Sequence, residues 1–238
     1  MLPNVAVIYG ETTVELRFFE IYRSSEYLLL LAEGILTSAA LAVSAGITGF
    51  VLAILLASAR HHRWPVLGQL SATFIEFVRN TPLIVQLFFV AFGLPLLLGY
   101  QWAFWAHALL ALIINFSAYF AEILRSGFLS VPVGQLEAAK TLGIPRFIAF
   151  WKILLPQAVA TMYPSLSSQF IFLFLTTGVI AEIGVRDLTF AGLFIDSRSF
   201  RSFEVFFTLT ILYILMALSF KGVLRLVFVK KFSWWSAP

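Results

Sequence analysis

The stretch GILTSAALAVSAGITGFVLAILLASA, residues 34–59, runs for 26 positions without a charged side chain. A helix crosses the hydrocarbon core of a bilayer with about 20 apolar residues, and a charge at its centre costs roughly 2.5–3.5 kcal/mol on insertion scales. This stretch is therefore long enough and apolar enough to span a membrane. It predicts an integral membrane protein.

The composition of the whole chain agrees with that prediction. Hydrophobic residues make up 61% of the 238 residues, charged residues make up 12%, and the mean hydropathy is +0.94. Soluble domains are roughly 45–50% apolar and about 25% charged, so this excess is too large for a soluble core. The chain contains no cysteine, which excludes disulfides and thiolate metal sites.

Four more spans are predicted from the other charge-free runs. Residues 80–121 are long enough for two spans, and the glycines and the proline of GLPLLLGYQW (93–102) indicate a turn between them. Residues 153–181 form a fourth span. Residues 205–220 form a fifth, which extends to 229 if two basic side chains near its end reach the membrane surface. The predicted fold class is all-α, a polytopic membrane protein with five transmembrane helices.

The lysines and arginines predict the orientation of the spans. If the loop after the first span is cytoplasmic, the inside holds 11 of the 16: Arg60, Arg63, Arg79, Arg125, Lys140, Arg146, Lys152, Lys221, Arg225, Lys230 and Lys231. The outside holds five: Arg17, Arg23, Arg186, Arg198 and Arg201. Cytoplasmic loops carry the excess of basic residues, so the N-terminus is expected outside and the C-terminus inside. The net charge of +4 thus reflects orientation, and no nucleic-acid partner is expected.

The chain is expected to form one membrane domain with short ends. Residues 1–27 form an extracytoplasmic segment, with a short surface helix expected within 11–31. Residues 28–230 form the transmembrane domain, and 231–238 form a cytoplasmic tail. The first residues lack the basic region and clean apolar core of a signal peptide.

The loop 125–155 is the longest on the predicted cytoplasmic side, and it is half polar. A helix is predicted at 135–142, with Glu137 in its first turn at the positive end of the helix dipole. Gly143 suits the position after a helix end, and Pro145 prevents the helix from resuming at once. Two interpretations follow from these residues: a helix that docks in a groove of another protein, or a connector lying flat among the headgroups.

The pattern Glu137-Ala138-Ala139, three residues, Gly143, nine residues, then Ile153-x-Leu155-Pro156 resembles the EAA loop of ABC importer permeases. Three other stretches resemble the polar amino-acid permeases of the histidine, glutamine and arginine type. They are VRNTPLIVQLFF (78–89), FSAYFAEILRSGFLSVPVGQLEAAKTLG (116–143) and TFAGLFIDSRSFRSFEVF (189–206). The similarity runs from about residue 34 to 229.

The resemblance implies the type I permease fold of ABC importers and a function in transport. The EAA loop would be a coupling helix that docks on a cytoplasmic ATPase. Glu137 would cap this helix and pair with a partner charge, and Ala138, Ala139 and Gly143 would be contact or clearance positions. Pro156 would set the angle of the fourth span.

The resemblance also implies partners and a location. The chain would be a bacterial inner-membrane subunit paired with a second permease, identical or homologous. Two ATPase subunits would lie below the pair, and a periplasmic or surface-tethered solute-binding protein would lie above it. ATP would be used by the ATPase subunits, with no cofactor in this chain and no enzymatic activity of its own.

Polar side chains in or near the spans are candidates for the solute path. They are Arg79, Thr81, Asn115, Tyr119, Glu122, Thr176, Thr177 and Glu182. Arg79 and Glu122 lie near the cytoplasmic ends of spans, where they form a structural ion pair or line the path. After Gln169-Phe170-Ile171 the family pattern resembles a Lys-Asp-Thr-Ser run, whereas this chain has Leu175, Thr176, Thr177 and Gly178.

Other functions find less support in the sequence. No G-x-x-x-x-G-K-[ST], H-E-x-x-H or G-x-S-x-G motif occurs, and the three histidines are not spaced as metal ligands. A self-contained channel would need charged rings or a glycine-rich filter in its spans. The expected function is the permease subunit of an ATP-driven ABC importer for polar amino acids or related small zwitterions. Opines and betaine-like osmolytes are alternative solutes.

Overall fold

The computed structural model describes residues 6–9 and 12–233. Strands β1 (Ala6–Tyr9) and β2 (Thr12–Glu15) pair antiparallel, with Ala6 opposite Glu15. A short helix was expected within 11–31. The structure has α1 (Phe19–Tyr22) there, which covers only a single turn. The next helix already begins at Ser25. Most of the predicted tail 231–238 lies outside the described residues.

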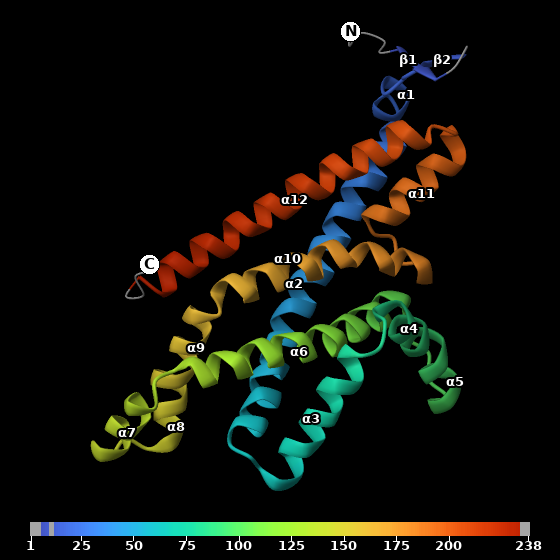
Figure 1. Cartoon of the computed structure of the whole chain (residues 1–238). Helices are drawn as coiled ribbons and strands as arrows, with labels where there is room; N and C mark the ends of the chain where they lie inside the picture. The colour runs from blue at the N-terminus through green and yellow to red at the C-terminus, as the bar shows by residue number, and fades with distance from the viewer. Residues whose placement is uncertain (1–5, 10–11, 234–238) are drawn as a thin grey trace.

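Helices joined by short turns and loops make up the rest of the described chain, which agrees with the all-α prediction for the membrane domain (Figure 1). In chain order they are α2 (Ser25–His61), α3 (Pro65–Arg79), α4 (Leu83–Phe88), η1 (Phe89–Gly93), α5 (Leu94–Leu98), α6 (Phe104–Ser130), α7 (Val133–Thr141), α8 (Arg146–Ala149), η2 (Phe150–Leu154), α9 (Leu155–Thr161), α10 (Tyr163–Thr176), η3 (Thr177–Ile183), α11 (Leu188–Ser199) and α12 (Ser202–Lys231).

Four continuous helical segments are long and apolar enough to cross a membrane: α2 (25–61), α6 (104–130), α10 together with η3 (163–183) and α12 (202–231). A fifth span is counted when the bent pair α3 and α4–α5 is taken as one. The predicted start of the second span, residue 80, is wrong, because this residue lies in the break between α3 and α4. Helix α3 before the break was not predicted, because it carries the charged residues Glu76 and Arg79 and so is not a charge-free run.

Two prolines change the helix type without ending the helix. Pro95 follows the π-helical turn η1, and Pro156 follows the π-helical turn η2. Proline has no backbone N–H, so the hydrogen bond it would have made is lost and the preceding turn widens. The predicted turn within 93–102 therefore comes late, at Gly99, which takes a left-handed φ of 70°.

The first span, α2, forms the centre of the fold and packs chiefly on α6 (Figure 1). One face of α2 is lined by buried small residues, a pattern that lets membrane helices approach closely. They are Gly34, Ser38, Ala42, Ala45, Gly46, Gly49, Ala53 and Ala57. Helix α11 also packs against this face, since a Cβ built on Gly34 would lie 2.8 Å from Asp187 O.

Asp187 begins α11 beside Gly34. Its Oδ1 accepts a hydrogen bond from Phe190 N at 2.8 Å, and the Ser38 hydroxyl accepts one from Leu188 N at 3.2 Å. These bonds satisfy backbone donors that the first turn of a helix leaves unpaired. The side chain of Asp187 is fully buried, and this burial raises its pKa to about 6.

Candidate functional site

The second span is broken between Arg79 and Leu83, and the helices on either side differ in direction by 107°. The break falls at Asn80-Thr81-Pro82. Pro82 has no N–H to continue the helix, and it drives Thr81 before it out of the helical conformation. Broken spans of this kind occur in membrane proteins where the backbone lines a cavity or is buried in protein.

Gln86 holds the break in place. Its Nε2 donates to Val78 O at 2.8 Å and to Thr81 O at 3.2 Å, so it satisfies carbonyls that the break leaves without a helical partner. Its Oε1 accepts a hydrogen bond from Asn115 Nδ2 of α6 at 3.1 Å. The break is therefore tied to α6. Gln86 was not among the residues predicted from the sequence, although it is the only polar side chain in residues 83–92.

A cavity of about 480 Å³ opens at this break. Three segments that are distant in the sequence line it: the break itself, the middle of α6 and the end of α10. The lining residues are Arg79, Asn80, Thr81, Pro82, Leu83, Asn115, Phe116, Tyr119, Phe172 and Thr176. Five of the eight path candidates predicted from the sequence thus lie around one cavity, namely Arg79, Thr81, Asn115, Tyr119 and Thr176.

Arg79 lies between this cavity and an acidic side chain. Its Nη1 is 3.8 Å from Glu122 Oε2, and its guanidinium carbon lies 5.6 Å from the centre of the Tyr119 ring. A guanidinium over an aromatic face is attracted by the ring quadrupole. The two interpretations of Arg79 are therefore compatible, because one side chain makes the ion pair and lines the cavity.

Glu122 is the centre of a larger ion cluster rather than one half of a pair. Arg60 Nη1 donates to its Oε2 at 2.9 Å, and Arg125 Nε donates to its Oε1 at 2.9 Å. With Arg79 the cluster joins α2, α3 and α6. One carboxylate faces three guanidinium groups, which leaves two positive charges uncompensated within the cluster. Glu122 itself is not among the residues that line the cavity.

The cavity suits a small solute that carries a carboxylate. A guanidinium forms charge-assisted hydrogen bonds to carboxylates, and the surplus positive charge of the cluster disfavours a cation beside it. Thr81, Thr176 and Asn115 add hydroxyl and amide groups, while Phe116, Tyr119 and Phe172 add apolar surface. Convergent polar groups beside apolar and aromatic surface are typical of small-molecule sites.

Two predicted path residues lie away from this cavity. Thr177 is fully buried, and its hydroxyl donates to Phe174 O at 2.8 Å within its own helix. Glu182 is exposed in η3. Within the part of the chain that the structure describes, no group of three or more His, Asp or Glu side chains is arranged to hold a metal ion.

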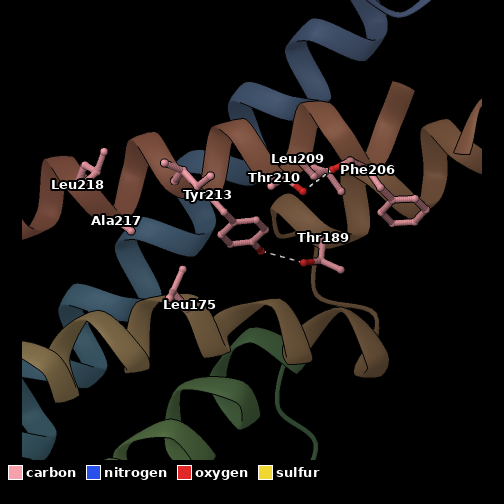
Figure 2. Close-up of a pocket in the computed structure, with 9 residues that line it drawn as sticks. Leu175, Thr189, Phe206, Leu209, Thr210, Tyr213, Ala217 and Leu218 are labelled. Atoms are coloured by element: carbon pink, nitrogen blue, oxygen red, sulfur yellow. Dashed lines mark hydrogen bonds between the residues drawn. The ribbon is translucent and has the colours of Figure 1, made fainter. Parts of the chain in front are cut away.

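A second groove, of about 510 Å³, lies between α10, α11 and α12 (Figure 2). Its lining is mostly apolar, with Leu175, Leu209 and Leu218 among the side chains. The hydroxyl groups of Tyr213 and Thr189 form a hydrogen bond of 2.8 Å with each other, as Figure 2 shows. This groove contains no charged group and none of the predicted path residues, so the cavity at the break is the better candidate for a polar solute.

The segment that resembles the EAA loop forms the compact helix α7, which projects far from the N-terminal hairpin (Figure 1). The helix begins at Val133, two residues earlier than predicted. Glu137 therefore lies in the second turn, makes no N-cap hydrogen bond, and does not benefit from the helix dipole as predicted. Its side chain is exposed, as is Ala138, whereas Ala139 is buried against the chain itself.

Gly143 ends α7 as predicted. Its φ is +72°, its N–H donates to Lys140 O at 3.0 Å, and Ile144 N donates to Ala139 O at 2.9 Å. These two hydrogen bonds form a Schellman motif, in which glycine is favoured because it has no Cβ to clash in the left-handed conformation. Pro156 follows the π-helical turn η2 at the start of α9.

Comparison with known proteins identifies the family. The sequence profile of the family described as "Binding-protein-dependent transport system inner membrane component" matches residues 49–231. The chain belongs to this family. It is therefore an inner-membrane permease subunit with several membrane spans, and not an enzyme in its own right, as the resemblance implied.

Individual relatives of this permease agree. A probable amino-acid ABC transporter permease protein, PatM of Vibrio harveyi, is 34% identical over 68% of this chain and 74% of its own length. The L-cystine transport system permease protein TcyL of Bacillus subtilis (strain 168) is 36% identical over 74% of this chain and 77% of its own. The octopine transport system permease protein OccM of Rhizobium meliloti is 35% identical over 80% of this chain and 81% of its own length.

Solved structures support the fold of the permease. A chain from a crystal structure titled as an amino acid ABC transporter with histidines is 30% identical, covers 89% of this chain and 97% of its own, and has a TM-score of 0.78. A chain of the MetNI methionine ABC transporter has a TM-score of 0.69 at 20% identity, covering 86% of this chain and 99% of its own, which supports the fold alone. The predicted ABC importer permease fold is confirmed.

Proposed function

We propose that this permease carries polar amino acids or related small zwitterions through the cavity at the break of its second span. The observation that carries the proposal is the lining of that cavity: Arg79, Asn115 and three hydroxyl-bearing side chains within an apolar membrane domain. Arg79 would hold the solute carboxylate. The names of the relatives support amino acids as the solute class.

Opines are the second candidate. They are amino-acid derivatives that carry carboxylates, and a relative of similar identity is named for octopine transport. The surplus positive charge around Glu122 favours a solute whose net charge is zero or negative. It disfavours strongly basic solutes. Betaine-like osmolytes carry a carboxylate and no net charge, so the charge of the cluster does not exclude them.

The assembly follows from membership of an ABC importer family. Such a permease works with an ATPase and a solute-binding protein, and we propose two ATPase subunits and a second permease that is identical or homologous. We further propose that the N-terminus lies outside and the C-terminus in the cytoplasm, because the basic residues favour that orientation. Helix α7 then faces the ATPase.

The proposed mechanism is alternating access driven by the partner chains. ATP-dependent closure of the ATPase pair moves α7, and α7 is joined through η2 and α9 to α10, which contributes Phe172 and Thr176 to the cavity. Movement of α10 relative to the break would open the cavity to one side and close it to the other. ATP would be hydrolysed by the partner, and this chain would supply the path.

Reconstitution tests this function. The permease is placed in proteoliposomes with its ATPase and binding protein, and ATP hydrolysis and solute uptake are measured across amino acids, opines, betaines and choline. We expect both activities to rise together with one class of carboxylate-bearing solute. Uptake that needs neither ATP nor a binding protein would contradict the importer function and indicate a channel. Stimulation only by a cationic solute that has no carboxylate, such as choline, would contradict the role proposed for Arg79.

A further inference from the structure

A separate basic pocket of about 280 Å³ lies between the end of α2 and the helix α7. Its rim carries His61, His62, Lys140 and Arg146. Its floor is apolar, because Phe150 and Leu154 are buried beneath it. This volume corresponds to about nine water molecules, so it admits a phosphate group with its attached ester chains.

The charge of this pocket is uncompensated. No carboxylate is among its lining residues, and no ion pair of Lys140, Arg146, His61 or His62 is found in the part of the chain that the structure describes. Arg60, one residue before His61, is already engaged by Glu122 at 2.9 Å. Two fixed positive charges around a concave site attract an anion.

The side chains around the pocket are of the kinds found at the depth of the lipid headgroups. Trp64 and Trp151 are half exposed beside two lining residues, with ring centres 6.2 Å from His62 and 5.4 Å from Phe150. Tryptophan is enriched where a membrane meets water. Leu142 and Phe147 next to the pocket are 77% and 74% exposed, which is unfavourable in water but suits the upper acyl region.

We propose that this pocket binds the phosphate group of an anionic phospholipid. Lys140 and Arg146 hold the phosphate, His61 donates a further hydrogen bond, and the acyl chains extend past Trp151 into the bilayer. The bound lipid joins α7 to the end of α2, so it stiffens the segment through which the ATPase is proposed to act. The assignment of the bound lipid to the inner leaflet rests on the membrane orientation given under the proposed function. The assignment of the pocket as a phosphate site does not depend on that orientation.

Native mass spectrometry of the full-length permease tests the proposal. The protein is titrated with phosphatidylglycerol or with phosphatidylcholine of the same acyl chains, and the bound lipids are counted. We expect one phosphatidylglycerol to be retained in preference to phosphatidylcholine. Lys140→Gln combined with Arg146→Gln should weaken its retention by roughly tenfold or more, since each basic residue near a lipid surface contributes to the attraction.

Two matched variants control for charge and folding. Lys221→Gln with Arg225→Gln removes the same charge from exposed positions of α12 and should retain the lipid as the wild type does. Lys140→Arg with Arg146→Lys keeps the charge and should also retain it. If the variant with both pocket residues neutralised fails to fold, Lys140→Gln alone takes its place, because Lys140 is exposed. The expected loss of lipid retention is then smaller.

Several results would overturn the proposal. They are equal retention of both lipids, equal losses in the pocket and α12 variants, or unchanged retention in the pocket variant. Displacement of the lipid by inorganic phosphate would assign the site to a soluble anion instead. Because binding is measured on the permease by itself, failure to find a transported solute would leave this test intact.

Discussion

Arg79 connects the ion cluster around Glu122 to the proposed solute cavity. Arg79 and Arg125 both approach the same carboxylate, but only Arg79 is among the residues that line the cavity. Replacing either one removes a positive charge from the cluster. The two positions therefore separate a role in solute binding from a role in holding the helices together.

Arg79→Gln is expected to lower solute uptake by roughly tenfold to a hundredfold, because a charged hydrogen bond to the solute carboxylate is lost. Uptake is measured in proteoliposomes with the partner subunits present. Arg125→Gln is the matched control and should lower uptake much less. Equal losses in both variants would mean that Arg79 acts only through Glu122.

Asp187 gives a pH dependence of stability with a defined sign. Its pKa is raised by burial from 3.8 to about 6, so between these values the folded state binds more protons than the unfolded state. Its contribution to stability is therefore full below about pH 3.8 and is lost as the pH rises through about 6. The shift corresponds to on the order of 2–3 kcal/mol.

Asp187→Asn keeps an acceptor for Phe190 N but cannot ionise. We expect the melting temperature of this variant, relative to the wild type, to increase as the pH rises from 4 to 7, which is measured by thermal unfolding in detergent. The other carboxylates are the same in both proteins, so their contribution cancels in the difference between the two melting temperatures. A constant difference across this range would show that Asp187 does not titrate there.

At the scale of the elements, the fold was predicted where charge-free runs are long and missed where a helix is interrupted. Residues 34–59 and 205–220 are included in α2 and α12. The bend at Asn80-Thr81-Pro82 was not predicted, because composition alone does not reveal that Gln86 turns back to satisfy the carbonyl groups of Val78 and Thr81. Pro82 after Thr81 was the available signal for a break.

The break between α3 and α4 should depend on Gln86. Gln86→Leu removes one donor to the carbonyl of Val78, which keeps hydrogen bonds from the hydroxyl and the N–H of Thr81. It also removes the acceptor of the buried Asn115 amide, which is expected to cost about 1–3 kcal/mol. Thermal unfolding measures the loss. Gln135→Leu, the same replacement at an exposed position of α7, should leave the melting temperature nearly unchanged. Similar melting temperatures for the two variants would contradict the assigned role of Gln86.

The helix α7 should transmit the action of the ATPase through its exposed side chains. Glu137→Lys is expected to abolish ATP-driven uptake while leaving the folded yield intact, because the Glu137 side chain is exposed and makes no hydrogen bond or ion pair within the described residues. Glu182→Lys, an equal charge reversal at an exposed position of η3, should retain uptake. Loss of folded protein in Glu137→Lys, or equal loss of uptake in both variants, would contradict the coupling role.

At the scale of the whole molecule, the sequence predicted the family and five of the ten residues that line the cavity, but not how they meet. Arg79, Asn115 and Thr176 lie far apart in the chain and were each selected because polar side chains are rare in apolar spans. Their convergence depends on the packing of α6 and α10 against the break. Thr177 was selected for the same reason, yet the helix turns it into the protein interior.

The central claim is that the cavity at the break is the solute path, and the absence of cysteine in the chain makes it directly testable. Thr81→Cys and Thr176→Cys, each alone, are placed in the assembled transporter, and the rate of labelling by a membrane-impermeant thiol reagent is measured from each side. Thr210→Cys, in the groove of Figure 2, is the control outside the path. We predict that both cavity cysteines react from one side at a time, that the side changes on ATP binding, and that transported solute slows the reaction. Labelling that is indifferent to ATP and to solute, or that proceeds from both sides at once, would contradict the account.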